Sequence, residues 1–315
     1  MTTPHEDAQP TAGSGDPTGE VQPSSEETAV HRAMALLAQH RLVTTLQMQQ
    51  LLSPGSTRQF TSGVLNTLRE AQLVSYAELP VGRTRAWFLT LRGVRAISSW
   101  PELRGRRVPA LGGPTEASLR AAHTLTVVRS HLAFLHDARR RGDEYGALDW
   151  VPEIGHRLPD TGGEDKLIAD AVMHYTSVEP DRLQYRAFVE VDRGTMSSER
   201  LAAKLISYAR FHDYTPQPVG RRGTVADQAA MLAWQRFYPR FPRILFILTG
   251  APEHSLRRRI DDLRAMTAAH PLVNQLAGHV RLGAALLEDL EQHGPTGTVW
   301  TPLAGEADRR SWMEL

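Results

Sequence analysis

The run Gln184-Tyr-Arg-Ala-Phe-Val-Glu-Val191 sets the fold class when it is taken together with the next two segments of the chain. Its apolar and aromatic content predicts a strand, and a helix is expected next at residues 197–212, with Ser197 or Ser198 as its N-cap. Ile244-Leu-Phe-Ile-Leu248 is a continuous apolar run, which suits a buried parallel strand. A strand, a helix and a buried parallel strand in this order predict an α/β sheet covered on both faces.

The same pattern extends in both directions and defines a domain at residues 115–303. A long amphipathic helix is expected at 115–141, followed by strands near 147–153 and 167–175. Beyond the buried strand we expect a helix at 254–269, a strand at 280–282 and a short helix at 286–292. The order predicts a mixed central sheet, and residues 304–315 are expected to form a C-terminal tail.

A smaller module precedes this domain, at residues 28–99. Three short helices are expected, at 29–39, from Thr44 or Thr45 to Leu52, and at about 57–71. The third would bury Phe60, Val64, Leu65 and Leu68 on one face. Two strand-like runs, 73–79 and 85–90, flank a turn at Pro80–Thr84. Three helices and a hairpin are the layout of a winged helix. Residues 100–114, rich in Pro, Gly and Arg, are expected as a linker.

Composition limits the class of protein. The chain has 315 residues, 41% of them hydrophobic, a formal net charge of +1 and no cysteine, which excludes a disulfide framework and a thiol nucleophile. Residues 1–28 hold six acids and no Lys or Arg, so 1–27 are expected to be a disordered acidic tail. No apolar run reaches membrane-spanning length and no signal peptide is evident, so we expect a cytoplasmic protein without a membrane partner.

Residues 57–107 hold nine Arg and three Glu, which points to an anionic partner. In a winged helix the third helix enters the major groove of double-stranded DNA, and the hairpin reaches the backbone or the minor groove. Arg, Gln and Asn can read purine edges, and Ser can bind phosphate. The expected DNA-binding residues are therefore Arg58, Gln59, Ser62, Asn66 and Arg69 on the helix and Arg83 and Arg85 on the wing. The alternative is a dimerisation or protein-docking module.

The two lysines of the chain indicate where a catalytic site is expected. Only Lys166 and Lys204 occur, against 34 arginines, and lysine is a compact charge whose pKa shifts readily. Near them, Asp170 ends or interrupts one strand. Glu190 and Asp192 lie two apart on the next strand and so share a face. These three carboxylates would suit Mg²⁺ or Mn²⁺, with Lys204 stabilising charge that develops on phosphorus.

The alternative is a strand end without metal, with Asp192 pairing Arg193 or capping the helix. Glu153 is a further candidate ligand. His123 and His131, on the long helix, are expected to be packing or surface residues.

At this point the chain resembles the replication-relaxation family. The resemblance lies in Arg41–Gln47, Trp87–Gly93, Ala169–Ala171, Phe188-Val-Glu-Val-Asp-Arg-Gly-Thr195 and Lys204-Leu-Ile-Ser-Tyr208, and it covers about residues 28–303. The family occurs on plasmids, phages and integrative elements of Gram-positive bacteria, and the arginine-rich, alanine-rich composition is typical of a high-GC, actinobacterial genome. The resemblance implies a winged helix fused to a domain of the PD-(D/E)xK nuclease (restriction-endonuclease-like) type.

Carried over, Asp170 would be the first acid of the nuclease motif and Glu190 the second. Ala169 stands where Pro is frequent, and Asp192 stands where the motif has its Lys. Some nuclease families move that Lys to the following helix, where this chain has Lys204. The resemblance thus implies Asp170, Glu190, Asp192 and Lys204 as catalytic residues with Mg²⁺ or Mn²⁺, or else an inactive relative that only binds DNA.

Two functions remain open on the sequence. One is a metal-dependent DNA-nicking or DNA-cleaving protein of a mobile element, recruited by its winged helix; the other is a non-catalytic initiator or regulator. A protein-docking adaptor and a tyrosine relaxase are weaker alternatives. A homodimer through the winged helix or the long helix, and contacts with other replication or conjugation proteins, are compatible with either function.

Overall fold

The computed structural model describes residues 25–52, 55–80, 82–103, 108–158, 166–215 and 231–315. The expected acidic tail lies outside the described residues except for its last three positions, which begin the first helix. Part of the expected linker, 104–107, and one position of the wing, Val81, also lie outside them.

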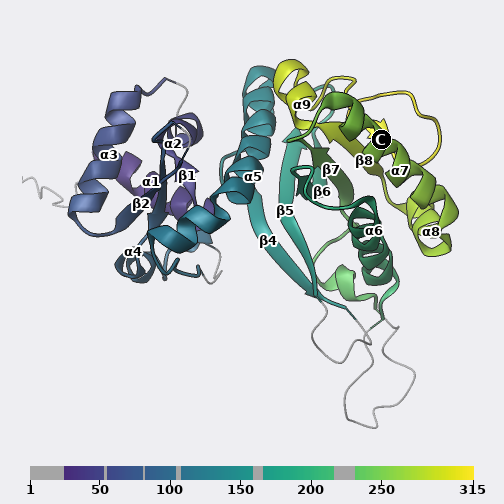
Figure 1. Cartoon of the computed structure of the whole chain (residues 1–315), viewed down its shortest axis with the longest axis horizontal. Coiled ribbons are helices and arrows are strands. Elements are labelled where there is room, and N and C mark those ends of the chain that lie inside the picture. The colour runs from purple at the N-terminus through teal and green to yellow at the C-terminus, as the bar shows by residue number, and fades with distance from the viewer. Residues whose placement is uncertain (1–24, 53–54, 81, 104–107, 159–165, 216–230) are drawn as a thin grey trace, which may run out of the picture.

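The N-terminal module has the elements expected for a winged helix (Figure 1). Helices α1 (Ser25–His40), α2 (Thr45–Leu52) and α3 (Arg58–Glu70) are joined to a small sheet of strands β1 (Val43–Thr44), β2 (Val74–Glu78) and β3 (Arg85–Leu89). The strand order is β1-β3-β2, with both pairs antiparallel. Thr57 caps α3, since its side chain accepts a hydrogen bond from the backbone N–H of Phe60.

The buried face of α3 differs from the expected one at Phe60, whose prediction as a core residue is wrong. Phe60 is 41% exposed, whereas Thr61 is fully buried together with Val64, Leu65 and Leu68. These four positions follow the i, i+3, i+4, i+7 spacing of one helix face. The hydroxyl of Thr61 donates to the Thr57 carbonyl oxygen at 3.2 Å, so a polar side chain can occupy the core face.

Two short elements without a strong periodic pattern come after the wing. Helix α4 (Leu91–Ala96) is capped by Thr90, and the 3-10 helix η1 (Pro101–Leu103) buries Leu103. Neither was expected. The long helix α5 (Pro114–Arg141) then begins within one residue of its predicted start.

The second domain is built on the predicted mixed sheet. Its order is β4-β5-β6-β7-β8-β9, formed by β4 (Trp150–Arg157), β5 (Lys166–Ser177), β6 (Leu183–Asp192), β7 (Arg243–Leu248), β8 (Leu282–Leu286) and β9 (Thr301–Pro302). Strands β6, β7 and β8 are parallel, and the remaining pairs are antiparallel. Strand β9 was not expected.

Helices cover both faces of this sheet, as predicted. On one face lie α6 (Ser198–Asp213), α7 (Glu253–Ala269) and α8 (Pro271–His279), the last of which was not expected. On the other lie α5 and α9 (Leu287–His293). Strand β7 shows the alternation: Ile244, Phe246 and Leu248 pack under α6–α8, and Leu245 and Ile247 pack on the opposite side.

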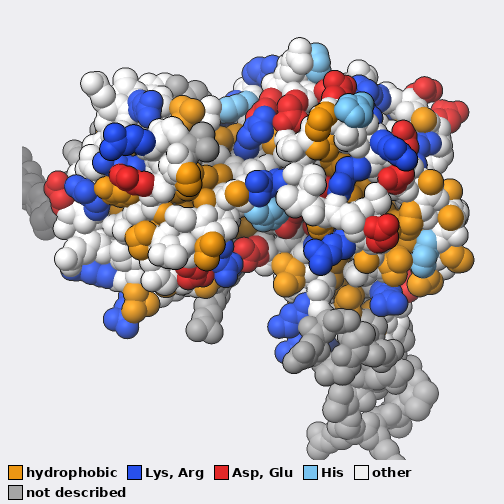
Figure 2. Space-filling model, viewed as in Figure 1, with side chains coloured by type: hydrophobic (Ala, Val, Ile, Leu, Met, Phe, Trp, Pro, Cys, Tyr) orange, Lys and Arg blue, Asp and Glu red, His pale blue; other side chains and the backbone are white. Residues whose placement is uncertain are grey.

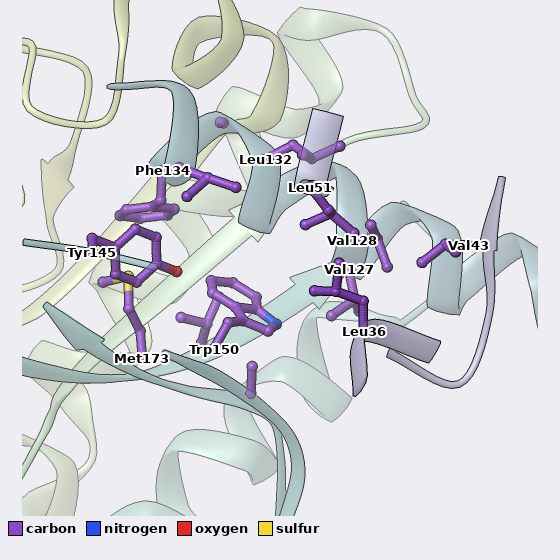
Figure 3. Close-up of a cluster of buried hydrophobic side chains, with 14 of the residues drawn as sticks. Leu36, Val43, Leu51, Val127, Val128, Leu132, Phe134, Tyr145, Trp150 and Met173 are labelled. Atoms are coloured by element: carbon purple, nitrogen blue, oxygen red, sulfur yellow. The ribbon is translucent and has the colours of Figure 1, made fainter. Parts of the chain in front are cut away.

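The N-terminal module and the sheet domain share one hydrophobic core (Figure 3). Leu36 of α1, Val43 of β1 and Leu51 of α2 join Val127, Val128 and Leu132 of α5, and the cluster continues to Trp150 and Met173 of the sheet. Figure 1 shows α5 lying between the two parts. Because these side chains are buried together, helix α5 fixes the winged helix against the sheet domain.

The last residues of the chain pack into this core instead of forming the expected tail. Trp312 is fully buried, and its ring lies edge-on to Phe134 and to Tyr175. Residue Arg310 forms an isolated bridge with Trp300. Within the part of the chain that the structure describes, no helix is both long and apolar enough to cross a membrane.

Candidate functional site

The site begins where strands β5 and β6 separate, at Asp170. Pairing with β6 stops at Ala171, opposite Val189, and Asp170 also has no partner in the β4 ladder. Its carboxylate lies between the strands: Oδ2 accepts a hydrogen bond from the backbone N–H of Val191 at 2.7 Å. The expectation that Asp170 interrupts its strand is thus correct for the ladder, although β5 itself continues through it.

Glu190 lies directly beside this point on β6 and is buried, with 1% exposure. Tyr208 donates its hydroxyl proton to Oε1 at 2.5 Å, and the Nζ of Lys204 lies 3.0 Å from Oε2. Lys204 and Tyr208 are four residues apart on α6 and therefore project from the same face of that helix. Lys204 also donates to the carbonyl oxygen of Ile168 at 2.6 Å, which fixes its amino group between β5 and β6.

Burial controls the protonation of this cluster. It raises the pKa of Glu190 to about 8, with the charge of Asp170 adding to the increase, while Lys204 and Tyr208 oppose it. Burial also raises the pKa of Tyr208, well above its ordinary value. Near neutral pH, Glu190 therefore takes up a proton readily unless a further positive charge approaches it.

His123 of α5 completes the cluster, and the sequence reasoning missed it. Its Nε2 lies 3.1 Å from Oδ1 of Asp170, and this hydrogen bond raises the pKa of His123. His123 is exposed and His131 is buried, so both fit the expected packing or surface roles, but the contact of His123 with Asp170 was not expected. No local motif connects His123 with Asp170, because the two lie 47 positions apart and only the packing of α5 on β5 brings them together.

Asp192 points to a different set of partners. Its Oδ1 accepts from the backbone N–H groups of Thr195 and Met196, at 3.2 and 3.1 Å, and its Oδ2 accepts from Nη2 of Arg259 at 2.8 Å. Arg259, on α7, also donates to the carbonyl oxygen of Met196. These bonds hold the turn between β6 and α6. Asp192 therefore pairs with Arg259 instead of the expected Arg193, and Ser197 instead of Asp192 caps α6.

The structure therefore brings Asp170, Glu190 and Lys204 together and directs Asp192 elsewhere. Among the described residues, no three His, Cys, Asp or Glu side chains lie close enough together to hold a metal ion. Mg²⁺, however, commonly binds one or two protein carboxylates and completes its shell with water and substrate phosphate. Asp170 and Glu190, joined through the β6 backbone, fit that smaller donor set.

Two other residues considered from the sequence are not part of the cluster. Glu153, held at φ 52° in the interruption of β4, pairs with Arg41 of the N-terminal module at 2.5 Å. It therefore links the two domains. Lys166 is the exposed first residue of β5.

The predicted DNA-binding residues lie on α3 and the wing, at the far end of the molecule from the sheet domain (Figure 1). Arg58, Gln59 and Arg69 are exposed, and Ser62 and Asn66 are half-buried. Figure 2 shows Lys and Arg side chains over this part of the surface, at the left of the view.

On the wing, Arg83 is exposed with φ 48°. The guanidinium of Arg85 lies 4.5 Å from the centroid of the Tyr76 ring. Both side chains are exposed on the wing.

Comparison with known proteins identifies the chain at the level of its family. No curated protein and no solved structure matches it. The model of the replication-relaxation family matches residues 34–225, which is more than half of the chain and spans the winged helix, α5 and the sheet as far as α6. Membership of this family suggests a role in the replication or relaxation of a plasmid or other mobile element. The chain belongs to the replication-relaxation family.

Proposed function

We propose that the protein is a metal-dependent DNA-nicking or DNA-cleaving protein that acts in the replication or relaxation of a plasmid or other mobile element. One observation carries the proposal. Lys204, from the helix that follows β6, lies 3.0 Å from Glu190, and Asp170 of the neighbouring strand lies beside it. This arrangement resembles the acid–acid–lysine combination of the nuclease motif, with the lysine on the following helix.

Each side chain has a distinct role in this proposal. Asp170 and Glu190 would hold Mg²⁺ or Mn²⁺, which polarises the phosphodiester and lowers the pKa of a bound water. Lys204 would orient the attacking water and stabilise the charge that develops on the phosphoryl oxygens. Tyr208 fixes the carboxylate of Glu190. His123 is half-exposed beside Asp170 and could accept or deliver a proton at the scissile phosphate.

The winged helix would supply the target. Double-stranded DNA would bind along α3 and the wing. Because the N-terminal module packs on α5 in the shared core, the distance from the bound DNA to Glu190 would be fixed. A dimer would present two such sites, and replication or conjugation proteins of the same element are the expected partners.

The test is incubation of the purified protein with supercoiled plasmid from its own mobile element, in Mg²⁺, Mn²⁺ or EDTA. Wild-type protein should give nicked or linear DNA only with metal. Asp170→Asn, Glu190→Gln and Lys204→Met should each lose this activity while still shifting DNA in a gel. The matched control is Lys166→Met, which removes the other lysine of the chain. Cleavage that persists in Asp170→Asn and Glu190→Gln would rule the proposal out.

A non-catalytic DNA-binding protein is the second candidate, and one observation favours it. Asp192, at the position of the motif's lysine, is bound by Arg259 and by the turn, while buried Glu190 is already held by Lys204 and Tyr208. A purely structural role would explain all of these bonds. In that case plasmid stays intact under every metal condition, and both wild type and Glu190→Gln shift it equally.

A further inference from the structure

A cavity lies at the end of the parallel strands opposite to the Asp170 and Glu190 cluster. It has a volume of about 880 Å³ and is lined by the first residues of β6, by Arg243 at the start of β7, and by Arg281 just before β8. The last turn of α6, the end of α8 and η2 (Ala233–Arg236) close its other sides. Since Arg186 precedes Glu190 by four positions on β6, the two sites are roughly 13 Å apart along the strand.

The lining of this cavity is strongly basic. It includes five arginines and two histidines, and no Asp or Glu is among the residues that line it. Two of the arginines have structural partners: Arg182 pairs with Glu144 at 2.7 Å, and Arg243 donates to the carbonyl oxygens of Trp312 and Met313 at 3.1 and 3.0 Å. Glu144 therefore offsets the charge of the exposed Arg182, whereas the two carbonyl contacts hold the guanidinium of Arg243 in place.

The remaining three arginines, Arg186, Arg240 and Arg281, have no ion pair or side-chain hydrogen bond with any described residue. Burial lowers the pKa of Arg243, and the positive charge of nearby Arg281 adds to this decrease. Two of the lining side chains have carboxylate partners, Arg182 with Glu144 and His212 with Asp213. The arginines still outnumber these carboxylates, and the excess positive charge in a concave surface attracts anions.

Aromatic rings lie among these charges. Trp234 and His279 are each stacked with His212, at centroid distances of 6.1 and 6.0 Å and interplanar angles of 13° and 12°. The indole N–H of Trp234 donates to the carbonyl oxygen of His212, which fixes the ring, and Phe241 meets both His212 and Trp234 edge-on. The side chain of His279 is exposed. Flat rings between unpaired arginines are the arrangement that binds unpaired bases and their phosphates.

We propose that this cavity, the basic aromatic pocket of Arg186, Arg240, Arg281, Trp234 and His279, binds a segment of single-stranded DNA. Phosphates would contact the three unpaired arginines, and bases would stack on the rings. Paired bases cannot present their faces to the rings, so the pocket favours a single strand over a duplex. The inference deepens the proposed function and rests on it for the role of the strand, which would be the one exposed after nicking or local melting.

The test measures binding directly, without cleavage. A fluorescein-labelled oligothymidylate is titrated with the full chain in EDTA, and anisotropy gives the Kd. Arg281→Ala and His279→Ala change exposed side chains and should leave the fold intact, which circular dichroism checks. Each should weaken binding about tenfold. The matched control is Arg258→Ala, which removes another exposed arginine, without an ion pair to any described residue, from α7 and should change the Kd by less than about twofold.

Two further arms separate the pocket from the other DNA contacts. Arg58→Ala should weaken duplex binding but leave oligothymidylate binding unchanged, and Glu190→Gln should leave it unchanged while removing cleavage. If the protein binds oligothymidylate as expected but does not nick plasmid, the proposed nicking function is refuted and single-strand binding by the pocket is not.

Equal Kd values for Arg281→Ala and Arg258→Ala would overturn the inference. So would displacement of oligothymidylate by polyglutamate as effectively as by unlabelled oligothymidylate, since that would show an acidic polypeptide site. Duplex DNA that competes as well as the single strand would overturn it too.

Discussion

Replacing Asp192 by Asn should cost stability and leave the chemistry intact. The amide oxygen of Asn can still accept the two backbone hydrogen bonds from Thr195 and Met196, but the charge opposite Arg259 is lost. A hydrogen bond to a charged partner is worth about 1.5–3 kcal/mol, and Asp192 is almost fully buried, so little of this is recovered from water. At about 2–4 °C per kcal/mol for a domain of this size, the melting temperature should fall by about 3–12 °C.

The assay pairs thermal unfolding with the plasmid-nicking measurement, both carried out on Asp192→Asn, Arg259→Met and the double variant. The two single changes should not be additive, because each removes the same bond, and the coupling should be about 1–3 kcal/mol. Asp170→Asn is the contrasting variant: it should lose nicking but cost about 1 kcal/mol or less, since its amide can still accept from Val191. If Asp192→Asn unfolds like wild type and loses all nicking, Asp192 is a metal ligand and the turn-holding role is refuted.

Three further predictions concern other parts of the molecule. Burial lowers the pKa of His156 to about 4, against about 6.5 when unfolded. As pH falls below 6.5, the unfolded chain therefore takes up a proton at His156 before the folded chain does, and about 3 kcal/mol of folding stability should be lost by pH 4. Urea unfolding over this pH range should show the loss in wild type and not in His156→Gln. Trp312→Ala should destabilise the protein by about 3–5 kcal/mol in the same assay, whereas a true tail would cost nothing. Arg83→Ala should weaken binding to all duplex sequences alike and lower the salt dependence by about one charge, as measured by gel shift over a salt series; an unchanged salt dependence would exclude a phosphate contact.

Much of the fold can be predicted from local pattern. The apolar run of β7, the capping serine before α6 and the strand-like stretch of β6 each predicted their element to within one residue. These segments carry strong hydrophobic periodicity, which identifies an element without reference to its neighbours. Helices α4 and α8 were missed because both are short, so their stability comes mainly from packing on the rest of the chain.

In the candidate site too, local spacing predicted some relations between residues, and other contacts depended on tertiary packing. Spacing alone indicated that Glu190 and Asp192 share a face of β6 and that Lys204 and Tyr208 share a face of α6, because strand and helix periods are properties of the backbone. Spacing could not indicate that Arg259 would reach Asp192 from α7, or that His123 would reach Asp170 from α5. Both contacts join segments more than forty positions apart.

The sequence by itself therefore determined the element types, the mixed α/β sheet and the winged-helix layout, since short-range periodicity and capping carry that information. Only the tertiary structure decided that Arg259 binds Asp192 while Lys204 reaches Glu190, that the last residues enclose Trp312, and that arginine side chains gather in the cavity lined by Trp234. The physical reason is that charge pairing and burial depend on distances between remote segments. Those distances are fixed by how the helices pack on the two faces of the sheet.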